Sequence, residues 1–441
     1  MNLPTPAIVA QSAVRRLPRL ALLLLCVSYV LAGFWGRAPW KSQDLESLGY
    51  MLQLAQPALG ETANWFRPSL LGQYDPQLAL LPYWLGAGFM QWAPQGWEDV
   101  FARLPFVGML GLTLAATWYA VYALARHPAA QPVAFAFGGE AKPSDYARAL
   151  ADGSLLALLA CLGLARLAHE ATPALSQLCF ASLIFVGLST LPRWRVKSGL
   201  AVGLGMLGLT LSGAPSVALW LGVGGSLIRA VAPIDPAQGR MRMLDLGLLA
   251  LLCLLCVTTA GALDLWRWRV VPHEMVDVHI LAKLMLWFTW PAWPLALWSL
   301  WRWRAQLSQA WRYPHLALPL WFVAVTVGAT WLTGLSDRAL LLALPGIAAL
   351  AAFALPTLKR SLSAFIDWFT LLFFSVGALI IWTVWLSMQT GFPAQPAINV
   401  ARLAPGFVLQ FSTTAFILAS LATLAWAGLV RWRAGRHRSA L

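Results

Sequence analysis

The sequence predicts an all-α polytopic membrane protein with about twelve transmembrane helices. Hydrophobic residues make up 59% of the 441 positions, charged residues make up only 11%, and the mean hydropathy is +0.67. Soluble domains carry about 25% charged residues, so this composition excludes an ordinary soluble protein. The chain also repeats apolar runs of roughly 17 to 25 residues, the length that crosses a bilayer as a helix.

Twelve apolar runs are candidates for such spans. They lie near residues 17–36, 104–125, 152–168, 171–191, 197–212, 214–232, 243–262, 281–301, 315–334, 339–356, 364–388 and 406–430. The stretch 78–92 is apolar but short, and Pro82, Gly86 and Gly88 interrupt it, so we expect an interfacial or re-entrant helix there. The first run follows basic residues, as in a signal peptide, but it continues without a small-residue cleavage site, so we expect an uncleaved span.

The basic residues fix the orientation of these spans. With both termini in the cytoplasm, the twelve-span arrangement places most of the 31 Lys and Arg residues on the cytoplasmic side, as the positive-inside rule requires. Counting 78–92 as a full span would move Arg193, Arg195 and Lys197 outside. The net charge of +14 therefore follows from membrane topology and predicts no nucleic-acid partner.

The acidic residues gather on the other side of the membrane. Most of the 17 Asp and Glu residues are predicted outside, and six of them lie in one long external loop, residues 37–103. These six are Asp44, Glu46, Glu61, Asp75, Glu98 and Asp99. Because the positive-inside rule concerns only Lys and Arg, the acid bias independently indicates that the chemistry faces outward.

Asp44 and Glu46 lie where the chain leaves the first span. One interpretation is structural, because Ser42 is placed to cap a short helix and Asp44 in its first turn would favour the positive end of the helix dipole. Three leucines then recur at helical spacing and predict an interfacial helix with one apolar stripe: Leu45, Leu48 and Leu52. The other interpretation is a carboxylate that acts as a base. These residues alone leave both open.

Several segments stand in the order of a known family. In the external loop they are an acidic helix start beside Pro39-Trp40, Asp75-Pro76 before Tyr83-Trp84-Leu85, and Arg103-Leu104-Pro105 at the next span. Further on come Gly208–Pro215, a turn between two spans, and Asp337-Arg338 followed by Leu344-Pro345. This order resembles the GT-C glycosyltransferases, in particular the aminoarabinose transferase and protein O-mannosyltransferase-like group (glycosyltransferase families 39 and 83).

The resemblance implies a GT-C fold and transfer of a sugar from a polyprenyl-phosphate-linked donor. The acceptor would be a lipid, a glycan or a protein at the periplasmic face of a bacterial inner membrane, as in modification of lipopolysaccharide or another cell-envelope glycan. The implied partners are this donor, this acceptor and membrane lipids. We expect one unit over residues 1–441, with 37–103 as the first periplasmic loop and no separate soluble C-terminal domain.

The resemblance also implies carboxylates near the acceptor and cations near the departing phosphate. The candidate catalytic residues are Asp44, chosen as the base by its position, with Glu46 and Asp75. The candidate substrate-binding residues are Lys41, Tyr74, Tyr83, Arg103, His169, Glu170, His273, Glu274, Lys283 and Arg338. Anchoring of lipid head groups is the alternative role for the basic members, and His169-Glu170 has the alternative of a simple turn pair.

Two positions depart from the family pattern. Asp75-Pro76-Gln77 stands where the family has Glu-Lys-Pro-Pro, and Ser212 replaces the Lys that precedes Gly-Pro. Two cations expected from the resemblance are therefore missing. Their absence leaves two alternatives open, an altered grip on the donor phosphate or an inactive protein.

The segment His273–His279 invites a metal interpretation. It reads His-Glu-Met-Val-Asp-Val-His and resembles the zinc motif HExxH with Asp in place of the second His. A part of the donor or acceptor pocket and an ordinary polar loop are the alternatives. No metal ligand is assigned and no cofactor is required, with a divalent metal kept as an option. The five cysteines all fall in apolar segments and predict no disulfide framework.

Two rival functions remain open. Twelve spans with both ends inside also suit a transporter or flippase for a lipid-linked substrate. Transporters concentrate charges near the bilayer midplane, whereas the predicted spans here are almost free of ions and the first external loop is long, which favours an enzyme. The missing family lysines suggest a third possibility, a non-catalytic GT-C-like scaffold.

Overall fold

The computed structural model describes residues 5–14, 18–34, 39, 41–57, 64–74, 79–233, 239–266, 275–407 and 409–434. Its contacts divide the chain into two compact units, Met1–Thr357 and Leu358–Leu441. Each unit is described by itself, and the expected organisation as one unit over residues 1–441 stays a prediction.

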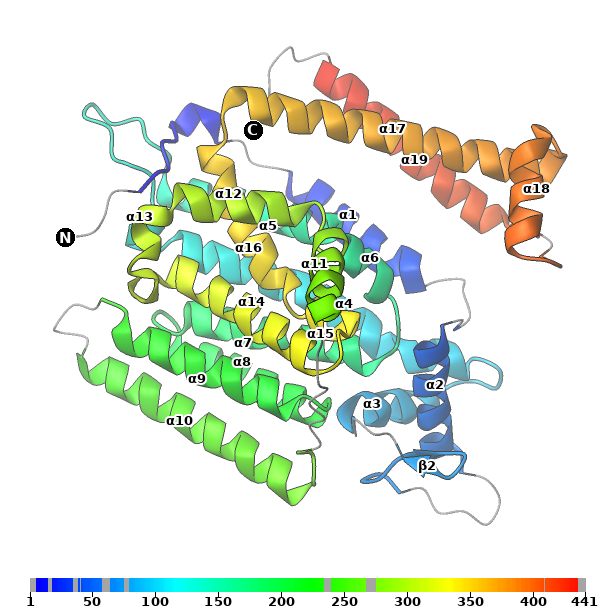
Figure 1. Ribbon diagram of the computed structural model, residues 1–441, viewed down its shortest axis with the longest axis horizontal. Coiled ribbons are helices and arrows are strands. Elements are labelled where there is room, and N and C mark those ends of the chain that lie inside the picture. Colours follow the sequence, from blue (N-terminus) through cyan, green and yellow to red (C-terminus); the bar gives the residue numbers. More distant parts are fainter. Residues whose placement is uncertain are drawn as a thin grey trace. The chain divides into compact units, whose positions relative to one another are not determined.

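The first unit is built almost entirely of helices (Figure 1). They are α1 (Arg19–Phe34), α2 (Ser42–Ala55), α3 (Leu81–Met90), α4 (Glu98–Ala125), α5 (Pro143–Ala160), α6 (Leu162–Leu167), α7 (Pro173–Thr190), α8 (Arg195–Leu211), α9 (Pro215–Val231), α10 (Gly239–Ala262), α11 (Met275–Phe288), α12 (Ala292–Arg302), α13 (Arg304–Leu307), α14 (Pro314–Leu332), α15 (Asp337–Leu341) and α16 (Leu344–Ala354). Short 3-10 turns lie at Gln11–Ala13, Pro128–Ala130, Ala310–Arg312 and Leu355–Thr357. One small antiparallel hairpin joins β1 (Ser69–Leu70) to β2 (Gln73–Tyr74).

The second unit contains α17 (Arg360–Thr390), α18 (Ala394–Leu403) and α19 (Thr413–Ala434). Hydrogen bonds of 3.0 Å from Trp382 Nε1 to Thr423 Oγ1 and 3.1 Å from Trp426 Nε1 to Ser375 Oγ join α17 and α19. The pairing order makes the two helices antiparallel. In each of the two helices, the most apolar stretch of 18 residues contains no buried residue.

The helix lengths confirm an all-α polytopic membrane protein. Within the described ranges, α4, α7, α10, α14, α17 and α19 are long and apolar enough to cross a membrane. The predicted total of twelve spans is not reached by this criterion. For example, α8 and α9 hold 17 residues each, about 25 Å of helix against a hydrocarbon core of about 30 Å. Twelve spans therefore stay a prediction.

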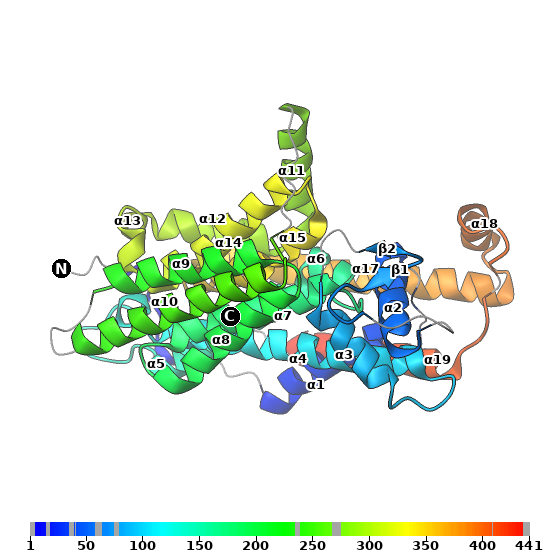
Figure 2. The same ribbon diagram turned by 90° about the horizontal axis from the view of Figure 1, so that it is seen from below.

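Two runs predicted as continuous spans, 152–168 and 281–301, are broken in the structure. The chain bends by 99° between α11 and α12 (Figure 2), where Pro291 has no backbone N–H and cannot continue a helix. The other break falls at Cys161, between α5 and α6. The Leu162 N–H donates to the Trp290 carbonyl at 3.0 Å, so the two breaks stabilise each other.

The core of the first unit surrounds α16. All eleven residues of this helix are buried, as expected for a helix that is apolar on every side. It packs against α5, α12 and α14 (Figure 1), while α7, α8, α9 and α10 form an adjoining row. This frame carries the short helices α2, α3, α6 and α15, which position the candidate site.

The predicted interfacial helix at 78–92 is α3, whose ten residues are too short to cross a bilayer. It packs between α2 and α4. The Leu80 N–H donates to the Leu211 carbonyl at 2.8 Å and ties the start of α3 to the end of α8. This bond attaches α3 to the helical frame.

Candidate functional site

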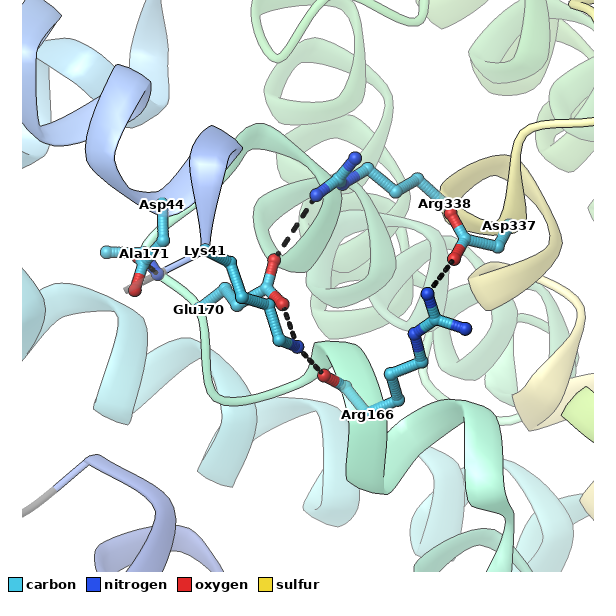
Figure 3. Close-up of polar contacts among 7 residues, drawn as sticks. All are labelled: Lys41, Asp44, Arg166, Glu170, Ala171, Asp337 and Arg338. Carbon is cyan, nitrogen blue, oxygen red and sulfur yellow. Dashed lines mark hydrogen bonds and ion pairs between the residues drawn. The ribbon is translucent and has the colours of Figure 1, made fainter. Parts of the chain in front are cut away.

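Three segments far apart in the sequence meet at the buried carboxylate of Glu170 (Figure 3). Lys41, at the start of α2, donates from Nζ to Glu170 Oε1 at 2.5 Å. Arg338, in α15, donates from Nη2 to Glu170 Oε2 at 3.4 Å. The Glu170 side chain is only 1% exposed. We refer to these three residues as the Glu170 cluster.

Ion pairing explains how a carboxylate is tolerated at this depth. An isolated buried charge costs several kcal/mol in lost hydration, and paired cations offset that cost. Lys41 and Arg338 are each about one quarter exposed, so both cations lie at the boundary between protein and surroundings. The Glu170 cluster therefore presents two positive side chains at an accessible rim, and a buried negative charge holds them in place.

Arg166 and Asp337 flank the cluster (Figure 3). The Lys41 ammonium also donates to the Arg166 backbone carbonyl, and Arg166 Nη2 lies 3.7 Å from Asp337 Oδ2. The Arg166 guanidinium stacks over the Trp287 ring at 5.1 Å. Sequence reasoning did not select Arg166, although its position four residues before Glu170 in an apolar segment was an available signal.

Asp44 is attached to the loop that carries Glu170. Its Oδ1 accepts a hydrogen bond of 2.9 Å from the backbone N–H of Ala171, and the side chain is 2% exposed. The buried face of α2 comprises Asp44, Ser47, Tyr50, Met51 and Leu54. Asp44 thus points into the protein.

Two features of α2 refine the sequence-based picture. The N-cap residue is Lys41, whose backbone is extended, so the expectation that Ser42 caps this helix is wrong. Ser42 is instead the first helical residue. Of the predicted leucine stripe, Leu45 and Leu52 are 49% and 43% exposed, whereas Leu48 is half-buried and packs against the core.

His169 fixes the same loop to the end of α1. Its Nε2 lies 2.8 Å from the Tyr29 carbonyl oxygen, and its ring packs against Tyr29 and Phe34. Gly33 makes this approach possible, because a Cβ atom there would lie 2.0 Å from the His169 ring. His169 therefore positions its neighbour Glu170.

Tyr83 and Arg103 are buried where α2, α3 and α4 pack together. Tyr83 is 3% exposed and stacks on Tyr50 with ring centroids 5.0 Å apart, which joins α3 to α2. Arg103 is 5% exposed and lies in the second turn of α4, against which α2 and α3 pack. These two residues support the helix that carries Asp44.

The remaining candidates lie elsewhere. Glu46 is on the exposed side of α2, Tyr74 is 59% exposed on β2, and Lys283 is exposed on α11. Within the described part of the chain, no hydrogen bond or ion pair joins these three to the Glu170 cluster. Asp75, His273 and Glu274 lie outside the described residues.

The turn predicted from Gly208–Pro215 is present between α8 and α9. Gly213 has a φ of +86°, which only glycine adopts without strain, and Pro215 starts α9. The Ser212 carbonyl accepts a hydrogen bond of 2.7 Å from Gln177 Nε2 of α7, the helix that directly follows the Glu170 loop. Ser212 thus lies at the same end of the unit as the Glu170 cluster.

Among the residues that the structure describes, no group of three or more His, Cys, Asp or Glu side chains is placed to hold a metal ion. The five cysteines are free thiols. The candidate site therefore contains one oriented carboxylate, Asp44, beside the two cations that Glu170 holds. Such a set can position a proton acceptor beside a site for an anion.

The helical frame defines the fold as that of an all-α polytopic membrane protein. The fold is similar to that of a solved structure, ArnT from Cupriavidus metallidurans in the apo state, which aligns with a TM-score of 0.54 at 14% identity. The alignment covers 88% of this chain and 66% of the ArnT chain, just under two thirds of that protein. No protein-family model and no curated protein matches the sequence. At this identity the similarity establishes the fold.

Proposed function

We propose that this protein is a glycosyltransferase that moves a sugar from a polyprenyl-phosphate-linked donor to a lipid, glycan or protein acceptor at the periplasmic face of a bacterial inner membrane. The observation that carries the proposal is that the buried Glu170 carboxylate binds Lys41 and Arg338. The next residue, Ala171, donates its backbone N–H to Asp44, so this carboxylate lies beside the two cations. The GT-C fold supports it independently.

Asp44 is the proposed base. In the reaction an acceptor oxygen attacks the anomeric carbon of the donor sugar, and the bond from that carbon to the lipid phosphate oxygen breaks. A proton leaves an acceptor hydroxyl, and a carboxylate beside it takes that proton as the new bond forms. The Ala171 N–H fixes one Asp44 oxygen at 2.9 Å, which orients the carboxylate before the acceptor binds.

Lys41 and Arg338 are the proposed phosphate ligands. The leaving group is a lipid phosphate that gains negative charge as the bond breaks, and fixed cations stabilise that charge. Arg338 supports this role because its contact to Glu170 is long, at 3.4 Å, and its buried Nε has no hydrogen-bond partner among the described residues. A phosphate oxygen can supply the missing acceptor. These two cations would replace the lysines that the family pattern leads one to expect.

The experiment that tests the proposal is transfer of radiolabelled sugar from polyprenyl-phosphate donors into a membrane lipid extract by the purified protein. We expect wild type to label a new product and Asp44→Asn to lower the rate by about 10²- to 10⁴-fold, the range for removal of a general base. Asn can still accept the Ala171 N–H, so the fold should persist. Asp99→Asn, an acid of the same loop region, is the matched control.

The same assay separates the alternatives. A Glu46→Gln variant tests whether the exposed carboxylate of α2 takes part, and full activity would remove Glu46 from the catalytic set. Equal transfer by wild type and Asp44→Asn would contradict the assigned base. If wild type binds a polyprenyl phosphate but transfers no sugar from any donor tested, the transferase proposal fails and the scaffold or flippase reading replaces it.

A further inference from the structure

A cavity of about 820 Å³ lies between α1, α4 and α5. Its lining is mostly apolar and consists of one face of α1, within residues 19–31, opposed by residues 107–122 of α4 and completed by α5. The length of α1 along the cavity corresponds to about 18 Å. Such a volume and length suit a hydrocarbon chain.

One end of this cavity is polar. Arg19, Arg148 and Asp152 line it, together with Trp118, Tyr119 and Tyr122. Arg148 precedes Asp152 by one helical turn on α5, so the two side chains share a face. Basic and aromatic residues gathered at one end of an apolar lining are typical of a site at the membrane interface.

Asp152 is the unusual member of this set. It is 4% exposed, and its Oδ1 accepts a hydrogen bond of 2.8 Å from Trp118 Nε1. Its Oδ2 has no hydrogen-bond partner in the part of the chain that the structure describes. A buried carboxylate oxygen without a donor is costly, so the cavity offers a place for a ligand that carries one.

This polar end is remote from the Glu170 cluster. Arg19 begins α1, whereas Phe34 at the other end of α1 contacts His169. The 16 residues of α1 correspond to about 24 Å. A lipid head group at Arg19 would thus lie at the other end of α1 from the proposed donor phosphate, in the leaflet where the sequence places the cytoplasm.

We propose that this cavity binds an aminophospholipid, a lipid whose head group carries both a phosphate and a primary ammonium. Arg19 and Arg148 bind the phosphate, Asp152 accepts a hydrogen bond from the ammonium, and an acyl chain occupies the apolar part. The choice follows from charge complementarity, because two cations and one anion at the rim match a phosphate and an ammonium. An acyl chain alone would leave Asp152 Oδ2 without a donor. The proposal does not depend on the proposed glycosyltransferase activity.

Native mass spectrometry of the full chain in detergent tests this assignment. Phosphatidylethanolamine and phosphatidylcholine have the same charges, but only the first carries N–H donors. We expect wild type to retain one phosphatidylethanolamine about tenfold more tightly than phosphatidylcholine, the value of one hydrogen bond to a charged group. Asp152→Asn still accepts from Trp118 Nε1 and should bring the ratio of the two affinities close to one.

A pair of glycine variants supplies the matched control. Gly111 lines the cavity, Gly108 lies one turn earlier on α4 outside it, and a Cβ at either position meets no atom within 4 Å. Gly111→Phe fills part of the cavity and should lower retention of both phospholipids at least about tenfold. Gly108→Phe should retain them as wild type does. These two variants keep the test valid if Asp152→Asn fails to fold.

Three outcomes would overturn the proposal. The first is equal retention of phosphatidylethanolamine and phosphatidylcholine by wild type, since Asp152 would then accept no hydrogen bond from the ammonium. The second is unchanged retention by Gly111→Phe, which would place the bound lipid outside the cavity. The third is displacement of phosphatidylethanolamine by polyprenyl phosphate at equal concentration, which would assign the cavity to that lipid.

Discussion

Glu170 and Asp245 are both 1% exposed carboxylates bound by two cationic side chains, but the two groups are built differently. Asp245 accepts from Arg195 Nε at 2.7 Å and from Arg229 Nε and Nη2 at 3.0 and 2.7 Å. Glu170 has one close contact, to Lys41, and a longer one of 3.4 Å to Arg338. Both oxygens of Asp245 are held by short bonds, whereas the Arg338 contact is loose.

The origin of the partners differs as well. Asp245 and its arginines belong to three consecutive helices, α8, α9 and α10, which pack side by side (Figure 1). Lys41, Glu170 and Arg338 come from the ends of short elements that are far apart in the sequence (Figure 3). Buried ion pairs therefore serve two purposes in this protein. The Asp245 group joins three helices, and we propose that the Glu170 cluster holds its two cations for an incoming anion.

The largest effect that separates the two groups is expected at Asp245. Asp245→Ala leaves Arg195 and Arg229 without their buried counter-charge, and removal of one partner of a buried pair costs about 3–5 kcal/mol in the free energy of unfolding. Unfolding by detergent titration, followed by circular dichroism, measures this loss. Sugar transfer per folded molecule should stay at the wild-type level. A stable but inactive Asp245→Ala protein would refute the division of roles.

The next effect is expected at Arg338 and concerns activity. Arg338→Gln removes a proposed phosphate ligand and should lower the transfer rate by about 10²- to 10³-fold, the range for loss of one preorganised donor. The free energy of unfolding of the Arg338→Gln protein should lie closer to the wild-type value than that of the Asp245→Ala protein, because Lys41 still pairs with Glu170.

The neighbouring arginine is the control for this prediction. Arg166 is 52% exposed and lies 3.7 Å from Asp337, and an exposed pair of this kind contributes about 0–1 kcal/mol. Arg166→Gln should therefore change stability little and leave most of the transfer activity. Equal loss of transfer in the Arg166 and Arg338 variants would show that general positive charge, and not the Arg338 contact, matters.

Composition and periodicity were sufficient to predict the fold class. Apolar runs of membrane length are dictated by the bilayer, so the helices α4, α7, α14 and α19 were predicted within a few residues at most ends. The breaks at Cys161 and Pro291 were not predicted, because both runs stay apolar through them. The Leu162 to Trp290 hydrogen bond that stabilises them is a contact between distant segments.

The sequence indicated which residues belong to the candidate site, but not which of them pair with one another. Lys41, Asp44, Glu170 and Arg338 were each selected from scarce charges near predicted span ends, and the structure brings them together. That Glu170 is the centre could not be foreseen, because its partners lie 129 and 168 residues away. Glu46 was selected by the same reasoning as Asp44, but helical geometry turns it to the exposed side.

The smallest predicted effect concerns how the Glu170 loop is held against α1. Gly33→Ala places a Cβ 2.0 Å from the His169 ring, so the ring and its loop must shift, and overpacking of this kind costs about 1–3 kcal/mol. Because Glu170 follows His169 directly, the shift should also lower sugar transfer, while the Asp245 group on α10 is unaffected. Gly377→Ala, where a Cβ meets no atom within 4 Å, is the control. Unchanged transfer by Gly33→Ala would mean that the position of Glu170 does not depend on His169. The Glu170 cluster would then tolerate movement, as an ion pair at the protein surface does.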